Sequence, residues 1–274
     1  MSDAVTLRVR SPVERRLEAD AITPDRFASA STSEIARLPL WDGPRQIALG
    51  DVFDVRGERS STVRVAGDVS RLDAIGAGMT LGELAIEGSA GRYLGTRMSG
   101  GVLRISGNVA DGAGLEMIGG LLDITGDAGD RVGGARLAAS KGMLGGEIIV
   151  RGRAGADVGA SMRRGTIVIT GDAGARAGTR MIAGNVIVLG SAGDEPGRFN
   201  KRGTIVVVGH VDVPSSYRLV CTYRPPHLAV TLAYLQRRRG VRVEPRWSDG
   251  PYRRYCGDMA ELGRGEILAW RSDG

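Results

Sequence analysis

The sequence predicts an all-β protein, a right-handed parallel β-helix: a single-stranded solenoid of about eight 19-residue coils, with small mixed α/β capping segments at both ends. Three observations predict this fold. Glycines recur at a fixed spacing, apolar residues precede each of them with a period of two, and methionines stand in the same register. A fixed period of about 20 residues is typical of stacked repeats, in which each unit buries its apolar face against its neighbours.

One glycine ends each short apolar run, and successive glycines lie 21, 19, 19, 26, 19, 19 and 19 residues apart. The interval of 26 is one period plus a seven-residue insertion near Gly134 to Ser140. Because 19 residues cannot hold a strand and a crossover helix, each coil must consist of strands and turns. We expect right-handed connections, as parallel strands almost always have. These marker glycines are Gly67, Gly88, Gly107, Gly126, Gly152, Gly171, Gly190 and Gly209.

The residues two and four places before each marker glycine are always apolar, which predicts a strand with one buried face. Further glycines, six before and seven after most markers, predict corners where a Cβ atom would not fit. The apolar pairs are Val63 and Val65, Leu84 and Ile86, Leu103 and Ile105, Leu122 and Ile124, Ile148 and Val150, Ile167 and Ile169, Val186 and Val188, and Ile205 and Val207.

Nine places before the marker stands a methionine in six coils: Met79, Met98, Met117, Met143, Met162 and Met181. In the last coil this place is Asn200. Methionine is flexible and fills irregular gaps, so one methionine per coil predicts a column of side chains in the interior. The alternative, a row of thioether metal ligands, is disfavoured because neither histidine nor cysteine accompanies it.

The two ends of the chain do not show the repeat, and solenoid ends need caps. Residues 1–58 are predicted to form an N-terminal cap, with a strand at 5–9 and a short helix after the Ser31–Glu34 capping box. Residues 59–210 form the repeat. Residues 211–274 are predicted to be an extension that packs on the repeat or on a partner, with strands at 219–223 and 266–270 and a helix at 227–239 that ends at Gly240.

The residue three places before each marker should point outward, and this row changes character halfway along. It is Arg64, Ala85, Arg104 and Asp123 in the first four coils, and Ile149, Val168, Ile187 and Val206 in the last four. A bare ladder of four β-branched side chains would be prone to aggregation. We therefore expect the apolar half to be covered, by the C-terminal segment or by a partner protein.

Composition excludes several classes of protein. The start of the chain lacks the pattern of a signal peptide, no run of residues is long and apolar enough to span a membrane, and the two cysteines suggest no disulfide framework, so we expect a cytoplasmic protein with no membrane partner. The net charge is +6, but acidic residues are interleaved with the arginines and no basic stripe with aromatic residues occurs. We therefore expect no nucleic-acid partner.

No motif indicates chemistry within the chain, so we predict no catalytic, cofactor-binding or metal-binding residue. His210 and His227 are the only histidines and have no metal-ligand spacing. Gly76 to Gly78 falls on the glycine grid of the repeat, so a nucleotide loop is not inferred from it. Asp68, Asn108, Asp127 and Asp172 each follow a marker glycine, which indicates turn chemistry rather than catalysis.

Arg237, Arg238 and Arg239 end the predicted helix, where positive charge interacts favourably with the helix C-terminus. An anion site is the alternative. Because 11 arginines and 7 acidic residues follow residue 210, an enzyme or ligand-binding protein that acts alone also stays open as a hypothesis.

The spacing G-x-x-G-x-x-x-G recurs, for example at Gly88, Gly91 and Gly95, and resembles the GXGXG β-helix domain. That domain closes the large subunit of glutamate synthase and constitutes the C subunit of formylmethanofuran dehydrogenase. The chain is more similar to this C subunit, since it is free-standing and carries the segments 38–43 (LPLWDG), 50–53 (GDVF), 75–79 (IGAGM) and 257–266 (GDMAELGRGE). The similarity covers nearly the whole chain.

The excess of arginine over lysine favours the bacterial member of this family, the C subunit of the formyltransferase/hydrolase complex. The resemblance implies a structural subunit of a complex that converts formyl-tetrahydromethanopterin to formate through a formylmethanofuran-type intermediate. It implies hydrolase-like, dehydrogenase-like and formyltransferase subunits as partners. A methanofuran-like carrier and tetrahydromethanopterin would be used by the complex and not be bound by this chain. The alternatives are the C subunit of a tungsten or molybdenum formylmethanofuran dehydrogenase, and a glutamate-synthase-type domain.

Overall fold

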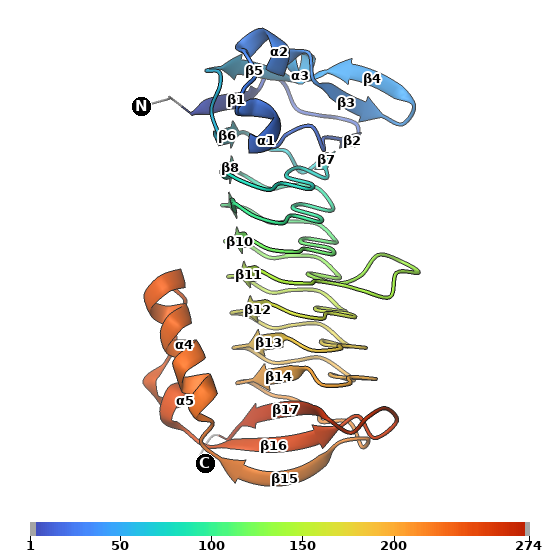
Figure 1. Cartoon of the computed structure of the whole chain (residues 1–274), viewed down its shortest axis with the longest axis vertical. Coiled ribbons are helices and arrows are strands. Elements are labelled where there is room, and N and C mark those ends of the chain that lie inside the picture. Colours follow the sequence, from blue (N-terminus) through green and yellow to red (C-terminus); the bar gives the residue numbers. More distant parts are fainter. Residues whose placement is uncertain (1–3, 272–274) are drawn as a thin grey trace.

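The structure, a computed structural model, describes residues 4–271 and is mostly β, as predicted. One 13-stranded sheet, largely parallel, runs the length of the molecule, and a 4-stranded sheet lies at its N-terminal end (Figure 1). No helix in residues 4–271 is long and apolar enough to cross a membrane.

The repeat forms eight consecutive parallel strands, each paired with the next. The pairing joins equivalent repeat positions, as in Leu122 to Ile148 across the insertion. A second column of bridges runs through Val69, Ala90, Val109, Ala128, Ala154, Ala173 and Ala192. Successive repeats therefore stack directly on one another, and the insertion projects from the stack (Figure 1). The strands are β6 (Thr62–Ala66), β8 (Glu83–Glu87), β9 (Val102–Ile105), β10 (Leu121–Ile124), β11 (Glu147–Val150), β12 (Thr166–Ile169), β13 (Asn185–Val188) and β14 (Thr204–Val207).

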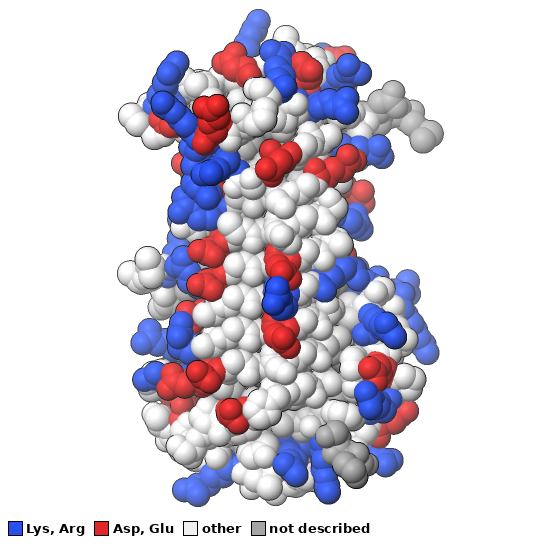
Figure 2. All heavy atoms as spheres, turned by 180° about the vertical axis from the view of Figure 1, so that it is seen from behind, with Lys and Arg blue, Asp and Glu red and all other residues white. Residues whose placement is uncertain are grey.

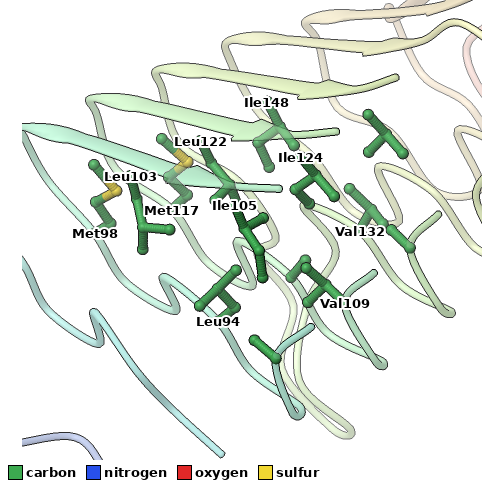
Figure 3. Packing of buried hydrophobic residues seen from close by; sticks show 14 of the residues in the cluster. Leu94, Met98, Leu103, Ile105, Val109, Met117, Leu122, Ile124, Val132 and Ile148 are labelled. Atoms are coloured by element: carbon green, nitrogen blue, oxygen red, sulfur yellow. The ribbon is translucent and has the colours of Figure 1, made fainter. Parts of the chain in front are cut away.

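The predicted interior is confirmed. Every residue of the eight apolar pairs is buried, and the six methionines of the predicted column are 0% exposed. Figure 3 shows Met98 and Met117 stacked beside Leu103 and Leu122. Asn200 ends the column: it is fully buried, its amide donates to the carbonyl of Gly203, and its Oδ1 accepts from the Gly203 amide. Both polar ends of Asn200 are thus satisfied where the methionines stop.

At the N-terminus, β1 (Val5–Val9) pairs in parallel with β6 and antiparallel with β5 (Phe53–Arg56). Strand β1 is thus an additional rung of the stack, with Val5 and Leu7 in the interior. The second sheet contains β2 (Leu17–Glu18), β3 (Pro39–Asp42), β4 (Arg45–Ala48) and β7 (Leu72–Asp73). The helices are α1 (Pro24–Phe27), α2 (Thr32–Ala36) and α3 (Leu49–Val52), and the predicted capping box at Ser31 begins α2.

At the C-terminus, β17 (Gly265–Trp270) pairs in parallel with β14 and continues the stack by one rung. Strands β16 (Tyr252–Gly257) and β15 (Arg218–Tyr223) follow in antiparallel order. Helix α4 (Pro226–Arg239) ends at Gly240 in the left-handed conformation, as predicted, and begins one residue earlier than expected. A short helix, α5 (Pro245–Asp249), lies beside it.

The apolar half of the outer row is covered by the C-terminal segment of the same chain and not by a partner protein. Ile149, Val168, Ile187 and Val206 form one buried cluster with residues of the tail. Figure 1 shows helix α4 beside the strands β11 to β14 that carry this row. The helix α4 contributes Leu228, Leu232 and Leu235, and the following segment contributes Val241, Val243, Tyr252 and Leu268. Leu268 of β17 lies opposite Val206 and extends the row by one rung.

Candidate functional site

The residues considered for chemistry are not assembled into a conventional centre. Within residues 4–271, no group of three or more His, Cys, Asp or Glu side chains could hold a metal ion. His210 is exposed and its Nε2 lies 3.2 Å from the Asp212 carboxylate. His227 lies in the first turn of α4, and Cys221 and Cys256 are free thiols.

The Asp and Asn residues after the marker glycines connect neighbouring coils, so the interpretation as local turn chemistry is wrong for three of the four. Asn108 accepts from the amide of Asp127 at 2.8 Å, Asp127 from that of Arg153 at 2.7 Å, and Asp172 from that of Ser191 at 2.7 Å. Only Asp68 bonds within its own turn, to the amide of Ser70. Coils about 4.8 Å apart bring the next amide within reach of a short side chain.

These contacts explain three of the marker glycines, Gly126, Gly152 and Gly190. A Cβ atom at Gly126 would lie 2.2 Å from Oδ1 of Asn108, and one at Gly152 would lie 2.2 Å from Oδ1 of Asp127. The glycine leaves room for the oxygen of the preceding coil. In Figure 2 the middle of the face is largely uncharged apart from a short column of charged side chains, and other charged side chains lie along the edges and at both ends.

A highly charged hollow lies where the insertion leaves the stack, and we call it the arginine groove. It has a volume of about 690 Å³ and crosses the coils between Arg131 and Phe199. One carboxylate, Asp157, lines it together with five arginines: Arg131, Arg136, Arg176, Arg198 and Arg180. Leu137 at the tip of the insertion forms part of its rim and is 85% exposed.

Three of the five arginines have carboxylate partners. Arg176 binds Asp157 through two hydrogen bonds of 2.8 Å, which raise the pKa of the Arg176 guanidinium. Arg198 lies 2.8 Å from Glu195, and Arg136 lies 3.7 Å from Glu116.

Arg131 and Arg180 differ from the other three arginines. Within residues 4–271, neither has a carboxylate within ion-pair distance. Arg180 lies over the ring of Phe199, 6.0 Å from its centroid. The groove therefore presents two guanidinium groups whose charge no carboxylate of the described chain neutralises.

The backbone at Arg131 and at the equivalent corners of other coils has a conformation that is unfavourable for residues with a Cβ atom. The positions equivalent to Arg131 in other coils are Tyr93, Gly112, Asp157, Arg176 and Glu195. Arg131 and the four of these residues that are not glycine have φ between +53° and +65°. Left-handed backbone costs a residue with a Cβ about 1 kcal/mol or more. Gly112 shows that glycine fits the same corner, so large polar side chains are held here against a local cost.

A second hollow, of about 630 Å³, lies on the N-terminal side of the insertion and shares Arg131, Arg136 and Leu137 with the arginine groove. Ala77 and Gly78 of the glycine-rich segment line it. Arg97, also in its lining, is paired with Glu116 at 3.1 Å. This hollow is thus less basic than the arginine groove.

The end of α4 is fastened to the stack by charged groups that sequence reasoning missed. Arg151 binds Asp123 through two hydrogen bonds of 2.9 Å and donates to the carbonyl of Arg239 at 2.7 Å. The hydrogen bonds that Arg151 donates to Asp123 raise the pKa of the Arg151 guanidinium, although burial lowers it. Arg239 itself pairs with Glu147 at 2.6 Å, while Arg237 and Arg238 are exposed. Arg151 thus satisfies a carbonyl that the helix leaves unpaired.

No family model matches the chain, but individual proteins do. The C subunit of molybdenum-containing formylmethanofuran dehydrogenase 1 from Methanosarcina barkeri is 41% identical over 95 residues, 33% of this chain and 32% of that protein. The C subunit of the formyltransferase/hydrolase complex Fhc from Methylorubrum extorquens is 36% identical over 89 residues, 32% of this chain and 34% of that protein. These alignments span about a third of each relative.

A solved structure matches over nearly the whole length. A chain in the crystal structure of the formyltransferase/hydrolase complex (FhcABCD) from Methylorubrum extorquens, in complex with methylofuran, is 34% identical with a TM-score of 0.90. The match covers 97% of this chain and 100% of that one. The chain belongs to the C-subunit family of formyltransferase/hydrolase complexes and formylmethanofuran dehydrogenases. This membership confirms the family predicted from the glycine spacing.

Proposed function

We propose that this chain is the structural C subunit of a formyltransferase/hydrolase complex. The near full-length likeness to a chain of the FhcABCD complex carries the proposal. In this role it bridges hydrolase-like, dehydrogenase-like and formyltransferase subunits in the cytoplasm. The complex converts formyl-tetrahydromethanopterin to formate through an intermediate on a methanofuran-like carrier. The chain itself binds neither cofactor and contributes no catalytic residue.

The architecture supports a scaffold role. Residues 59–210 form a right-handed β-helix between an N-terminal cap, 1–58, and a C-terminal extension, 211–274. The in-register pairing of successive strands and the second column of bridges support a single-stranded solenoid, and the general rule for parallel crossovers supports the right hand. Since the interior is filled by aliphatic and methionine side chains, only the outer surface is available to partners.

The C subunit of a molybdenum or tungsten formylmethanofuran dehydrogenase is the second candidate. The 41% identity with the Methanosarcina barkeri protein favours it, although over a third of the chain only. The two candidates differ in the subunits that accompany the chain and in whether the complex holds molybdenum or tungsten.

Affinity purification of the tagged chain from its native host, followed by mass spectrometry and metal analysis, tests both candidates. We expect stoichiometric hydrolase-like, dehydrogenase-like and formyltransferase subunits, and formyl-transfer activity in the complex but not in the isolated chain. A molybdenum- or tungsten-containing complex would support the second candidate. A chain that stays monomeric in its host, or that is active alone, would contradict the scaffold role.

A further inference from the structure

We propose that the arginine groove is a docking site for an acidic segment of a partner subunit. The inference rests on the proposed function, because it assigns one surface of the scaffold to one kind of partner. Its elements are the guanidinium groups of Arg131 and Arg180, the ring of Phe199 and the projecting side chain of Leu137.

Charge selects an acidic occupant. Among the described residues of the lining, Asp157 is the only carboxylate, and it is engaged by Arg176. Within the part of the chain that the structure describes, no carboxylate pairs with Arg131 or Arg180, so both can bind carboxylates of another protein. Arginine presents a planar, bidentate donor to a carboxylate, and such pairs fix register as well as affinity.

Shape selects a protein segment over a small molecule. The groove crosses the four coils that contain Arg131, Asp157, Arg176 and Phe199, which is about 15 Å at the spacing of neighbouring strands. Four or five extended residues span that distance. Exposed Leu137 and the stacked pair of Arg180 and Phe199 add the mixture of apolar, aromatic and arginine side chains that is typical of energetically important interface residues.

Among residues 211–271, none lines the groove itself. The tail reaches only its C-terminal end, where Asp258 accepts a hydrogen bond from the amide of Phe199 at 2.9 Å and Glu261 lines a neighbouring hollow with Arg180. Helix α4 packs on the outer row of the sheet, and the insertion projects from the opposite side of the stack (Figure 1). The groove and the covered row are thus separate surfaces, one free and one already closed. The backbone is left-handed at Arg131, Arg176, Arg180 and Phe199, which is unfavourable for residues with a Cβ atom. Their presence despite this cost supports a role in contact with another protein.

The test uses the reconstituted complex and the double variant Arg131→Glu, Arg180→Glu. The matched control is Arg237→Glu, Arg238→Glu, which makes the same change in net charge at exposed positions on α4. Circular dichroism first establishes that both variants fold, and calorimetry or interferometry then measures the Kd of the chain for its partner subunits at fixed salt. We expect the groove variant to bind on the order of 10²-fold more weakly, and the control to stay within about threefold.

A photo-crosslinking residue in place of Leu137 identifies the occupant by mass spectrometry. An acidic segment of a partner subunit is expected, and replacing its carboxylates with lysine should restore binding to the groove variant. Equal Kd values for wild type and groove variant, or a crosslink to a neutral segment or to a second copy of this chain, would overturn the inference. If the wild-type chain bound no partner subunit, the proposed function itself would fail.

Discussion

The first and second halves of the repeat have the same interior but opposite outer rows. Val63 and Ile205 are equally buried inside the stack, at its two ends. Outside, Arg64 and Arg104 are exposed in the first half, whereas Val168 and Ile187 are buried in the second. The inner positions therefore specify the coil, and the outer positions specify what is attached to it.

The boundary between the halves is a defined structure. Asp123 is the last polar member of the outer row, and Ile149 in the next coil is its first β-branched member. Arg151 bridges the boundary, since it binds Asp123 and a terminal carbonyl of α4. The helix thus ends where the apolar row begins, so that it covers the apolar half and leaves the polar half free.

The largest expected effect comes from the interior that both halves share. Met162→Asp should destabilise the protein by on the order of 5 kcal/mol, because it places a carboxylate in a fully buried apolar column. Urea unfolding monitored by circular dichroism measures the change, with Met162→Leu as the volume-matched control. Stability near that of the wild type for the Asp variant would mean that the column does not line the interior.

The outer row separates the halves directly. Val168→Asp should cost about 3 kcal/mol, because the side chain is buried under α4. The same substitution at Ala85, in the bare half of the row, should cost less than about 0.5 kcal/mol. Equal losses for the two variants in parallel urea titrations would mean that α4 does not protect the second half selectively.

The boundary itself should have an intermediate effect. Arg151→Ala removes hydrogen bonds to Asp123 and to the Arg239 carbonyl, which should cost about 1–3 kcal/mol. Hydrogen exchange should show faster opening of residues 226–239 than of the strands. Arg153→Ala is the control, because Arg153 is exposed and its contact with Asp127 is 3.5 Å. Unchanged exchange in α4 would show that Arg151 does not hold the helix end.

The smallest effect is expected in the polar outer row. Arg104 is exposed and lies 3.9 Å from the Glu83 carboxylate. Exposed ion pairs contribute between about 0 and 1 kcal/mol. Arg104→Ala should therefore change the unfolding midpoint only slightly. A loss as large as that of Val168→Asp would indicate that something covers the first half as well.

The repeat could be predicted because its signals are local and periodic. The methionines from Met79 to Met181 and the apolar pairs stand at fixed short distances before a marker glycine. The helix that ends at Gly240 is likewise indicated by residues close to one another in the sequence. The additional rungs β1 and β17 could be predicted as strands, but their partners could not, because nothing near Val5 or Ile267 indicates which strand they join.

The arginine groove was not predictable for the same reason. Arg131 and Arg180 are brought together by stacking, and the positions equivalent to Arg131 carry different residues in different coils, including Gly112 and Asp157. The role of Asn108 and Asp127 was missed because a short polar side chain after a glycine normally indicates a turn. Only the stacked geometry shows that their partners lie in the next coil.

The pairing of β17 with β14 has a consequence for the order in which the chain folds. Each coil of the repeat closes against a segment about 20 residues away, so that a nucleus can propagate along the chain from neighbour to neighbour. The last rung is different, because Ile267 must find Ile205 after β15, α4 and β16 have all been synthesised. The loss of chain entropy on closing this long loop makes it a late step. The apolar outer row stays unprotected until α4 has been synthesised and has packed on it, so the interval before this step is when newly made chains are most exposed to aggregation.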